Sequence, residues 1–234
     1  MSIKEGYMAY FIDLNKPTKE KYKIAAASYK TNFKNFFPFD KNSKILDIGC
    51  GMGHFLYYLK NEGYTNFKGI DIGKSQINFC KKYIDENVEK ADAFEYLKDK
   101  NQIYDVIVMN DFIEHITKEK VVELMEYIYY ALKQDGKVII KTPNMSNPFG
   151  IVSRYQDFTH EAGYNEYSII YIINAAGFKK ISLYPEFYAN LGFSRRIMNL
   201  IRSFMYQIFR FVCFIDRGVS PRIFSPNIIV VVEK

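Results

Sequence analysis

The sequence has little cysteine and no long apolar run, and each of these absences excludes a class of protein. It has no tryptophan and only three cysteines, Cys50, Cys80 and Cys213. An odd number of widely spaced cysteines without a neighbouring histidine argues against a disulfide framework and against a zinc site. No apolar run is long enough to span a bilayer, and the first residues lack the pattern of a secretory signal. We therefore expect a cytoplasmic protein with reduced thiols.

Arginine is missing from most of the chain. The first of seven arginines is Arg154, and the other six lie between residues 195 and 222. Between 186 and 222 they face only Glu186 and Asp216, although the whole chain has a net charge of just +6. Arginine binds phosphate through two parallel hydrogen bonds and also lies flat against apolar surface. Its confinement to one segment predicts a local role there.

The order of apolar segments predicts an α/β fold. Residues 44–49, 67–73, 88–94, 104–111 and 136–144 have the pattern of strands, with helical patterns between them, one of them over 118–135 ending at Gly136. Such alternation is typical of a doubly wound, mostly parallel sheet. Two further strand patterns follow at 181–186 and 227–234, and about 40 residues separate them, too many for a hairpin. We expect an antiparallel final strand preceded by a helical insertion over 186–225.

A glycine-rich turn follows the first of these strands. Asp47 precedes Gly49, Gly51 and Gly53, and the next residue is His54. A dinucleotide fingerprint requires glycine where His54 stands, so a nicotinamide cofactor is disfavoured. A carboxylate this close to the glycines would repel a pyrophosphate, but it suits a cationic amino-acid group.

From this point the sequence resembles the class I S-adenosylmethionine-dependent methyltransferases, and in particular O-methyltransferases of bacterial surface-polysaccharide clusters. The resemblance implies a seven-stranded Rossmann-like sheet in a methyltransferase domain over 40–234, with residues 1–39 as a helical lid. It also implies S-adenosylmethionine as cofactor and S-adenosylhomocysteine as product. Asp71 would hold the ribose hydroxyls, and Asp92 and Ala93 the adenine. The full expected cofactor set is Asp47, Gly49, Gly51, Gly53, Asp71, Ile72, Asp92, Ala93, Asn110 and Asp111.

A hydroxyl acceptor must lose a proton, so we expect a catalytic base. His160 lies in a polar loop after the fifth strand pattern and is the candidate, within a D-x-T-H-x segment that resembles those of glycan methyltransferases. It could instead only order the loop. Asp157 could orient the imidazole, and His115, after the fourth strand pattern, could organise the pocket. Asp157 and Glu161 could also bind a divalent cation, but we predict no metal site. Expected acceptor-binding residues are Tyr29, Arg154, Glu161, Arg195 and Arg196.

The pattern of residues 195–215 predicts an amphipathic helix. Apolar side chains, among them Leu200 and Phe204, recur on one broad face, with Arg195, Arg202 and Arg210 opposite. This pattern fits a helix on a membrane surface, a lid over the acceptor, a face between two copies of the chain, or an ordinary core helix. We favour a role on the acceptor side, since the arginines would bind a phosphorylated molecule.

These observations predict O-methylation of a sugar or phosphosugar, either nucleotide-linked or a polysaccharide precursor, in bacterial surface glycan biosynthesis. Methylation of a lipid-like quinone or another small aromatic acceptor is the first alternative. A catalytically silent protein that binds S-adenosylmethionine and acts through a partner is the second. No nucleic-acid partner is expected, whereas peripheral contact with the inner face of the membrane and a homodimer both stay open.

Overall fold

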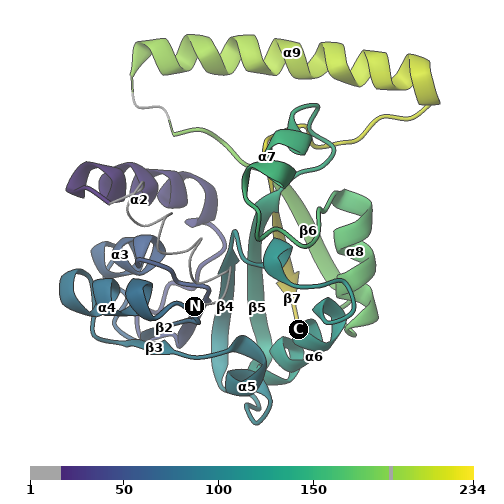
Figure 1. Ribbon diagram of the computed structural model, residues 1–234. Coiled ribbons are helices and arrows are strands. Elements are labelled where there is room, and N and C mark those ends of the chain that lie inside the picture. The colour runs from purple at the N-terminus through teal and green to yellow at the C-terminus, as the bar shows by residue number, and fades with distance from the viewer. Residues whose placement is uncertain (1–16, 190–191) are drawn as a thin grey trace.

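The computed structural model describes residues 17–189 and 192–234 (Figure 1). The first part of the predicted lid, residues 1–16, therefore lies outside the described chain. Within the rest of that segment lies helix α2 (Lys19–Phe33). Thr18 caps this helix, because its hydroxyl accepts a hydrogen bond from the backbone N–H of Lys21.

Seven strands form one mixed sheet in the order β3-β2-β1-β4-β5-β7-β6. The first five strands are parallel, and β7 is antiparallel to both β5 and β6. This confirms the predicted fold class, including the antiparallel final strand. The strands are β1 (Ile45–Ile48), β2 (Phe67–Asp71), β3 (Val88–Lys90), β4 (Tyr104–Asn110), β5 (Leu132–Pro143), β6 (Lys180–Pro185) and β7 (Asn227–Glu233).

The remaining helices connect these strands, and one of them is shorter than predicted. Helix α6 ends at Ala131 rather than just before Gly136, because Leu132 is already extended, with ψ of 139°. Leu132 is fully buried and pairs with Tyr104 of β4, so strand pairing overrides the helical pattern. The elements are α3 (His54–Asn61), α4 (Lys74–Tyr83), α5 (Ala93–Leu97), η1 (Ile113–His115), α6 (Val121–Ala131), α7 (Gly150–Gln156), α8 (Glu166–Ala175) and α9 (Phe193–Arg217).

Each face of the sheet carries an apolar cluster. Alternate residues of β4 point to opposite faces. Ile107 and Met109 join the cluster that includes α6 and α8, whereas Val106 and Val108 join the one beneath α2 and α3. With both faces covered, the edge where the parallel strands end is the place left for a ligand.

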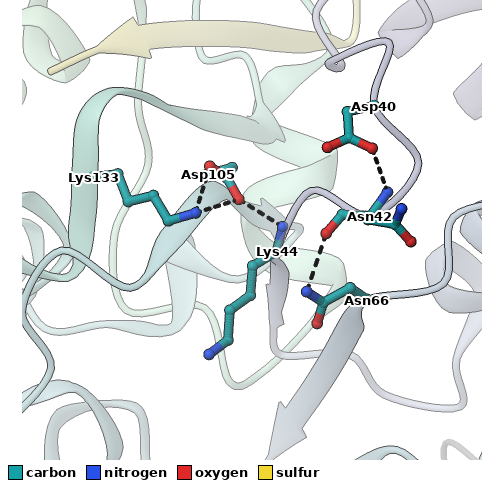
Figure 2. A network of polar contacts seen from close by, with 6 residues as sticks. All are labelled: Asp40, Asn42, Lys44, Asn66, Asp105 and Lys133. Carbon is teal, nitrogen blue, oxygen red and sulfur yellow. Dashed lines mark hydrogen bonds and ion pairs between the residues drawn. The ribbon is translucent and has the colours of Figure 1, made fainter.

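The opposite edge, where β1 and β4 begin, is tied together by polar contacts (Figure 2). The Asp105 carboxylate accepts hydrogen bonds from the Lys44 backbone N–H at 2.7 Å and from Lys133 Nζ at 2.8 Å. Nearby, Asn66 Nδ2 donates to the Asn42 carbonyl at 3.0 Å, and the Asn42 N–H donates to Asp40 at 2.9 Å. These groups satisfy one another, so this edge is structural.

The predicted helical insertion lies between β6 and β7. Its long helix, α9, stands apart from the sheet and beyond α7, which follows β5 (Figure 1). Pro185, at the end of β6, pairs with Ile228 near the start of β7. The chain therefore leaves the sheet and returns to it at nearly the same point.

Candidate active site

Three polar side chains meet where parallel strands end. Asp47 lies in β1, Asp71 ends β2 and Asn110 ends β4. The strand order reverses between β1 and β4, since the chain moves outward from β1 to β3 and then returns to β4 on the other side. Ligands of open α/β sheets bind in the crevice at such a reversal. Three of the sequence-predicted cofactor residues are thus placed at this edge.

The turn after β1 requires glycine. Gly49, Gly51 and Gly53 all have positive φ, of 75°, 52° and 81°. At Gly49 a Cβ would also lie 2.5 Å from the Phe112 ring. The Asp71 carboxylate fixes this turn, because it accepts hydrogen bonds from the backbone N–H groups of Gly51 at 2.9 Å and Gly73 at 2.7 Å. Burial raises the pKa of Asp71 despite these two bonds.

Within the described part of the chain, Asp47 and Asn110 have buried polar atoms without hydrogen-bond partners. The Asp47 side chain is only 1% exposed, and neither carboxylate oxygen has a hydrogen-bond partner. The amide nitrogen and oxygen of Asn110 are also buried without a hydrogen-bond partner. Burial, and next the Asp71 carboxylate, raise the pKa of Asp47 well above its ordinary value. Unsatisfied buried polar groups are costly, so these two residues are arranged for a bound molecule with hydrogen-bonding groups and positive charge.

Three of the other expected cofactor residues have different environments. Ile72 is exposed beside Asp71 at this edge, where it offers an apolar surface. Asp92 caps helix α5, because its Oδ1 accepts from the N–H groups of Phe94 and Glu95, and Ala93 next to it is buried. Asp92 therefore has a structural role of its own as the cap of α5.

Helix α2 covers the glycine turn. The Tyr22 hydroxyl donates to the Met52 carbonyl at 2.7 Å, and its ring stacks on His54 with centroids 4.5 Å apart. Burial lowers the pKa of His54, so its imidazole is held neutral. His54 thus belongs to the contact between helix and turn.

An ion pair that the sequence reasoning missed lies at the same edge, between a largely buried lysine and an exposed aspartate. Lys141 Nζ of β5 lies 2.6 Å from Asp111 Oδ2. The backbone of Asp111 has a positive φ of 50°. Burial is the largest influence and favours the neutral amine, but Asp111, Tyr29 and Glu186 together outweigh it and raise the pKa of Lys141. Tyr29 of α2 lies near this pair, and burial raises the pKa of its phenol while Lys141 opposes the shift. A lysine inside an apolar strand pattern was the signal available in the sequence.

His115 is held through one of its ring nitrogens. Its Nδ1 lies 2.9 Å from Thr159 Oγ1 and 3.2 Å from the Thr159 carbonyl. Thr159 Oγ1 donates its own proton to Asp157 at 2.7 Å, so the imidazole must be the donor at Nδ1. Burial lowers the pKa of His115, and the neighbouring His160 lowers it further. Its neutral form therefore has a lone pair on Nε2.

The candidate base has the same arrangement. His160 Nδ1 lies 2.9 Å from the Ser153 carbonyl, which can only accept, so Nδ1 carries the proton and the neutral ring has its lone pair on Nε2. The His160 and His115 rings meet edge to face, with centroids 4.8 Å apart. The structure thus brings together all three predicted catalytic residues, His160, His115 and Asp157.

Backbone contacts fix the loop that carries His160. The Arg154 guanidinium donates to the carbonyls of His160 and Glu161. The N–H groups of Glu161 and Ala162 donate to the Glu114 carbonyl at 2.8 and 3.0 Å. Arg154, predicted to bind the acceptor, here positions the loop. Of the other two arginines predicted for that role, Arg196 is exposed on α9, and the Arg195 side chain is outside the description.

Glu114 completes this cluster. Thr142 Oγ1 donates to its Oε2 at 3.0 Å, Oε1 has no partner, and burial raises the pKa of the carboxyl to about 8. Glu114, His115 and His160 each offer one ligand atom, all within 4.8 Å of one another. These three groups, rather than Asp157 and Glu161, form a set that could hold a divalent cation.

The sheet order, the glycine turn and the acidic residues at the strand ends define a class I S-adenosylmethionine-dependent methyltransferase. Residues 21–183 match the model of a family described as "Methyltransferase domain", so the chain belongs to this family. Its cofactor is S-adenosylmethionine. The unpartnered Asp47 carboxylate and the turn in which a Cβ would clash fit a cofactor with an ammonium group that approaches the backbone closely.

Individual relatives are more distant. The chain is 28% identical over 127 residues to a tRNA U34 carboxymethyltransferase of Helicobacter pylori, and 26% identical over 163 residues to phosphoethanolamine N-methyltransferase 3 of Arabidopsis thaliana. These matches cover 50% and 64% of this chain but only 47% and 31% of the relatives. The chain therefore spans less than half of either relative.

Solved structures share the fold. A SAM-dependent methyltransferase from Archaeoglobus fulgidus has a TM-score of 0.68 at 24% identity, with 96% of this chain and 99% of that chain covered. Phosphoethanolamine N-methyltransferase 2 of Haemonchus contortus, in complex with S-adenosyl-L-methionine, has a TM-score of 0.58 at 19% identity, with 97% of this chain and 60% of that chain covered.

Proposed function

We propose that this methyltransferase modifies a hydroxyl group of a small phosphorylated acceptor, with a sugar or phosphosugar of surface glycan synthesis as the acceptor class. The observation that carries the proposal is the His160 imidazole, whose Nδ1 is engaged by the Ser153 carbonyl and whose Nε2 is left to take a proton. A hydroxyl acceptor needs such a base, and a sulfonium methyl group is reactive enough to need mainly alignment.

The residues at the strand ends would hold the cofactor, which supplies an electrophilic methyl group. Asp47, buried without a partner, is suited to the ammonium of its amino-acid part, and Asn110 to neighbouring polar atoms. Asp71 is suited to the ribose hydroxyls while it also fixes the glycine turn. Ile72 offers an apolar surface to the adenine, and Asp92 and Ala93 lie at the start of α5 beyond β3.

On the acceptor side, His160 would take the hydroxyl proton at Nε2. Asp157 and Thr159 hold the neighbouring His115 ring, and Arg154 holds the loop backbone. Asp157 and His115 would thus be positioning residues. Tyr29 and Lys141 place a phenol and an ammonium close to Asp111 at the same edge. This ammonium gives a phosphorylated acceptor a charge partner there.

A phosphorylated amine is a second candidate acceptor. It is favoured by the similarity to phosphoethanolamine N-methyltransferases, two of which are named above. The two candidates share a phosphate and differ in the atom that receives the methyl group. An amine acceptor also has to lose a proton, so a base is equally needed.

The decisive experiment measures transfer of a labelled methyl group from S-adenosylmethionine to nucleotide-sugars, sugar phosphates, phosphoethanolamine and quinols. Product on sugar compounds supports the proposal, product on phosphoethanolamine supports the amine, and product on quinols supports the lipid-like alternative. Cofactor binding without transfer to any acceptor, in a protein that also lacks slow cofactor hydrolysis, favours the catalytically silent partner. A parallel series with a chelator tests the Glu114, His115 and His160 set, since loss of activity restored by a divalent cation would assign it a metal.

A further inference from the structure

Helix α9 has its apolar side turned away from the protein. Its large apolar side chains lie exposed along the whole length of the helix, in contrast to a core helix, which buries them. Leu200 is 72% exposed and Phe204 67%. The stripe at helical spacing consists of Phe193, Ile197, Leu200, Ile201, Phe204, Ile208, Phe211, Val212 and Ile215, all exposed.

The side of α9 that carries arginine faces the rest of the chain. The Arg202 guanidinium lies over the Tyr188 ring, 3.6 Å from its centroid, and Arg210 donates to the Arg222 carbonyl at 2.9 Å. On the same side of the helix, the Tyr206 ring stacks against the Phe224 ring, with centroids 6.4 Å apart. Since these contacts orient the helix, the apolar stripe cannot pack onto the domain without breaking them. The core-helix alternative is therefore wrong.

The exposed apolar surface continues onto the neighbouring helix. Phe149, which precedes α7, meets Phe209 of α9 with ring centroids 6.4 Å apart. Phe149, Ile151, Val152 and Tyr155 are all exposed. Both helices lie beyond the edge where β5 ends, which is the edge that carries the candidate active site (Figure 1).

We propose that α9 lies flat on the surface of an anionic lipid bilayer, with its apolar stripe in the interface. No helix in the described ranges is long and apolar enough to cross a membrane, whereas a helix with a strongly apolar face and arginines beside it is the form that binds at the interface. The segment 193–222 has six arginines and a single acid, Asp216. This charge complements anionic headgroups, and it opposes pairing with α9 of a second copy, which would place two segments with the same excess of positive charge side by side.

The test is sedimentation of the full chain with vesicles of phosphatidylcholine alone or mixed with phosphatidylglycerol. We expect binding to the anionic vesicles that weakens with salt. L200E/F204E should reduce it by about a hundredfold or more, since each buried apolar side chain contributes about tenfold. The matched control is Y167E/Y171E on α8, where both tyrosines are similarly exposed; it should bind like the unaltered protein.

Arginine variants test the electrostatic part. R196Q/R217Q changes two exposed side chains of α9 and should weaken binding to anionic vesicles by about 25-fold, at about fivefold for each arginine. An unchanged affinity would overturn the choice of an anionic surface.

Two other results would overturn the proposal. One is a dimer in solution that L200E/F204E abolishes, with no vesicle binding, since α9 would then join two copies. The other is the absence of both vesicle binding and self-association. Vesicle binding requires no methyl transfer, and cofactor affinity measured on every variant reports the integrity of the domain. A failure here is therefore distinguishable from a failure of the proposed catalytic function.

Discussion

The carboxyl edge of the sheet and helix α9 depart in opposite ways from the usual separation of polar and apolar side chains. At the sheet edge, Asp47 and Asn110 are buried polar groups without partners. On α9, Leu200, Phe204 and their neighbours are apolar groups in solvent. An unsatisfied polar group in a confined space is relieved by a small molecule with matching donors and charge. A long apolar stripe is relieved only by an extended surface. The two departures therefore indicate ligands of very different size.

The largest expected effect concerns the polar edge. D71A should weaken S-adenosylmethionine binding by about 2–4 kcal/mol, because it removes charge-assisted hydrogen bonds and frees the glycine turn. Calorimetry measures this directly. The matched control is D105A at the opposite edge of the sheet, where the carboxylate holds Lys44 and Lys133. Equal cofactor affinity in D71A and the unaltered protein would remove Asp71 from the site.

The next effect concerns proton transfer. H160A should lower turnover on the acceptor by about a hundredfold, as expected for a lost general base, and leave cofactor affinity unchanged. Steady-state rates and calorimetry on the same preparation separate the two quantities. A rate close to that of the unaltered enzyme would transfer the role to His115, whose Nε2 also carries a lone pair, and H115A would then show the loss.

The third prediction is that protons are released from Asp47 when the cofactor binds. Its pKa is raised by burial and by Asp71, so below that raised value the free protein holds a proton on the carboxyl. A bound ammonium group favours the ionised form and lowers the pKa. Cofactor binding should therefore release up to about one proton per site in acidic buffer, and less as pH rises through the raised pKa. Calorimetry in buffers of different ionisation enthalpy measures this release, which D47N should lack.

The smallest expected effect is on the free energy of unfolding when an apolar residue of α9 is replaced. It tests whether the apolar stripe of α9 is exposed. F204S should change the free energy of unfolding by less than about 0.5 kcal/mol, since exposed positions away from special features tolerate substitution. F178A, at a fully buried site, should cost about 3–5 kcal/mol. Denaturant unfolding of both variants decides the matter. A loss of several kcal/mol in F204S would mean that the stripe is packed, and the contrast between the two regions would fail.

The sequence could predict the sheet and the cofactor edge because both depend on local signals. Strand patterns, the glycines and Asp47 and Asp71 are set by the chain within a few residues. The end of α6 was missed, because the pairing of Leu132 with Tyr104 is a long-range contact. Lys141 was missed for the same reason, since its partner Asp111 comes from another strand end.

Helix α9 shows a different limit. Its two faces follow from the spacing of Leu200, Phe204 and the arginines, and the helix itself was predicted. A spacing does not say which face turns toward the domain, however. That is decided by Tyr188, Phe224 and Arg222, which come from the connections on either side of α9. Likewise, Arg154 was assigned to the acceptor on charge alone, while its partners are backbone carbonyls.

The pairing of Pro185 with Ile228 makes the segment that contains α9 separable from the rest of the chain. Because β6 and β7 are antiparallel neighbours, a short loop from the end of β6 to residue 223 could replace the excursion and leave the register of the sheet intact. Residues 223–225 would be kept, since their carbonyls accept hydrogen bonds from the side chains of Asn144 and Asn147. The excursion can thus lengthen, shorten or be exchanged between homologous chains at little cost to folding. Proteins that share this catalytic domain could therefore differ in the surface to which they bind, because only the segment between β6 and β7 has to change.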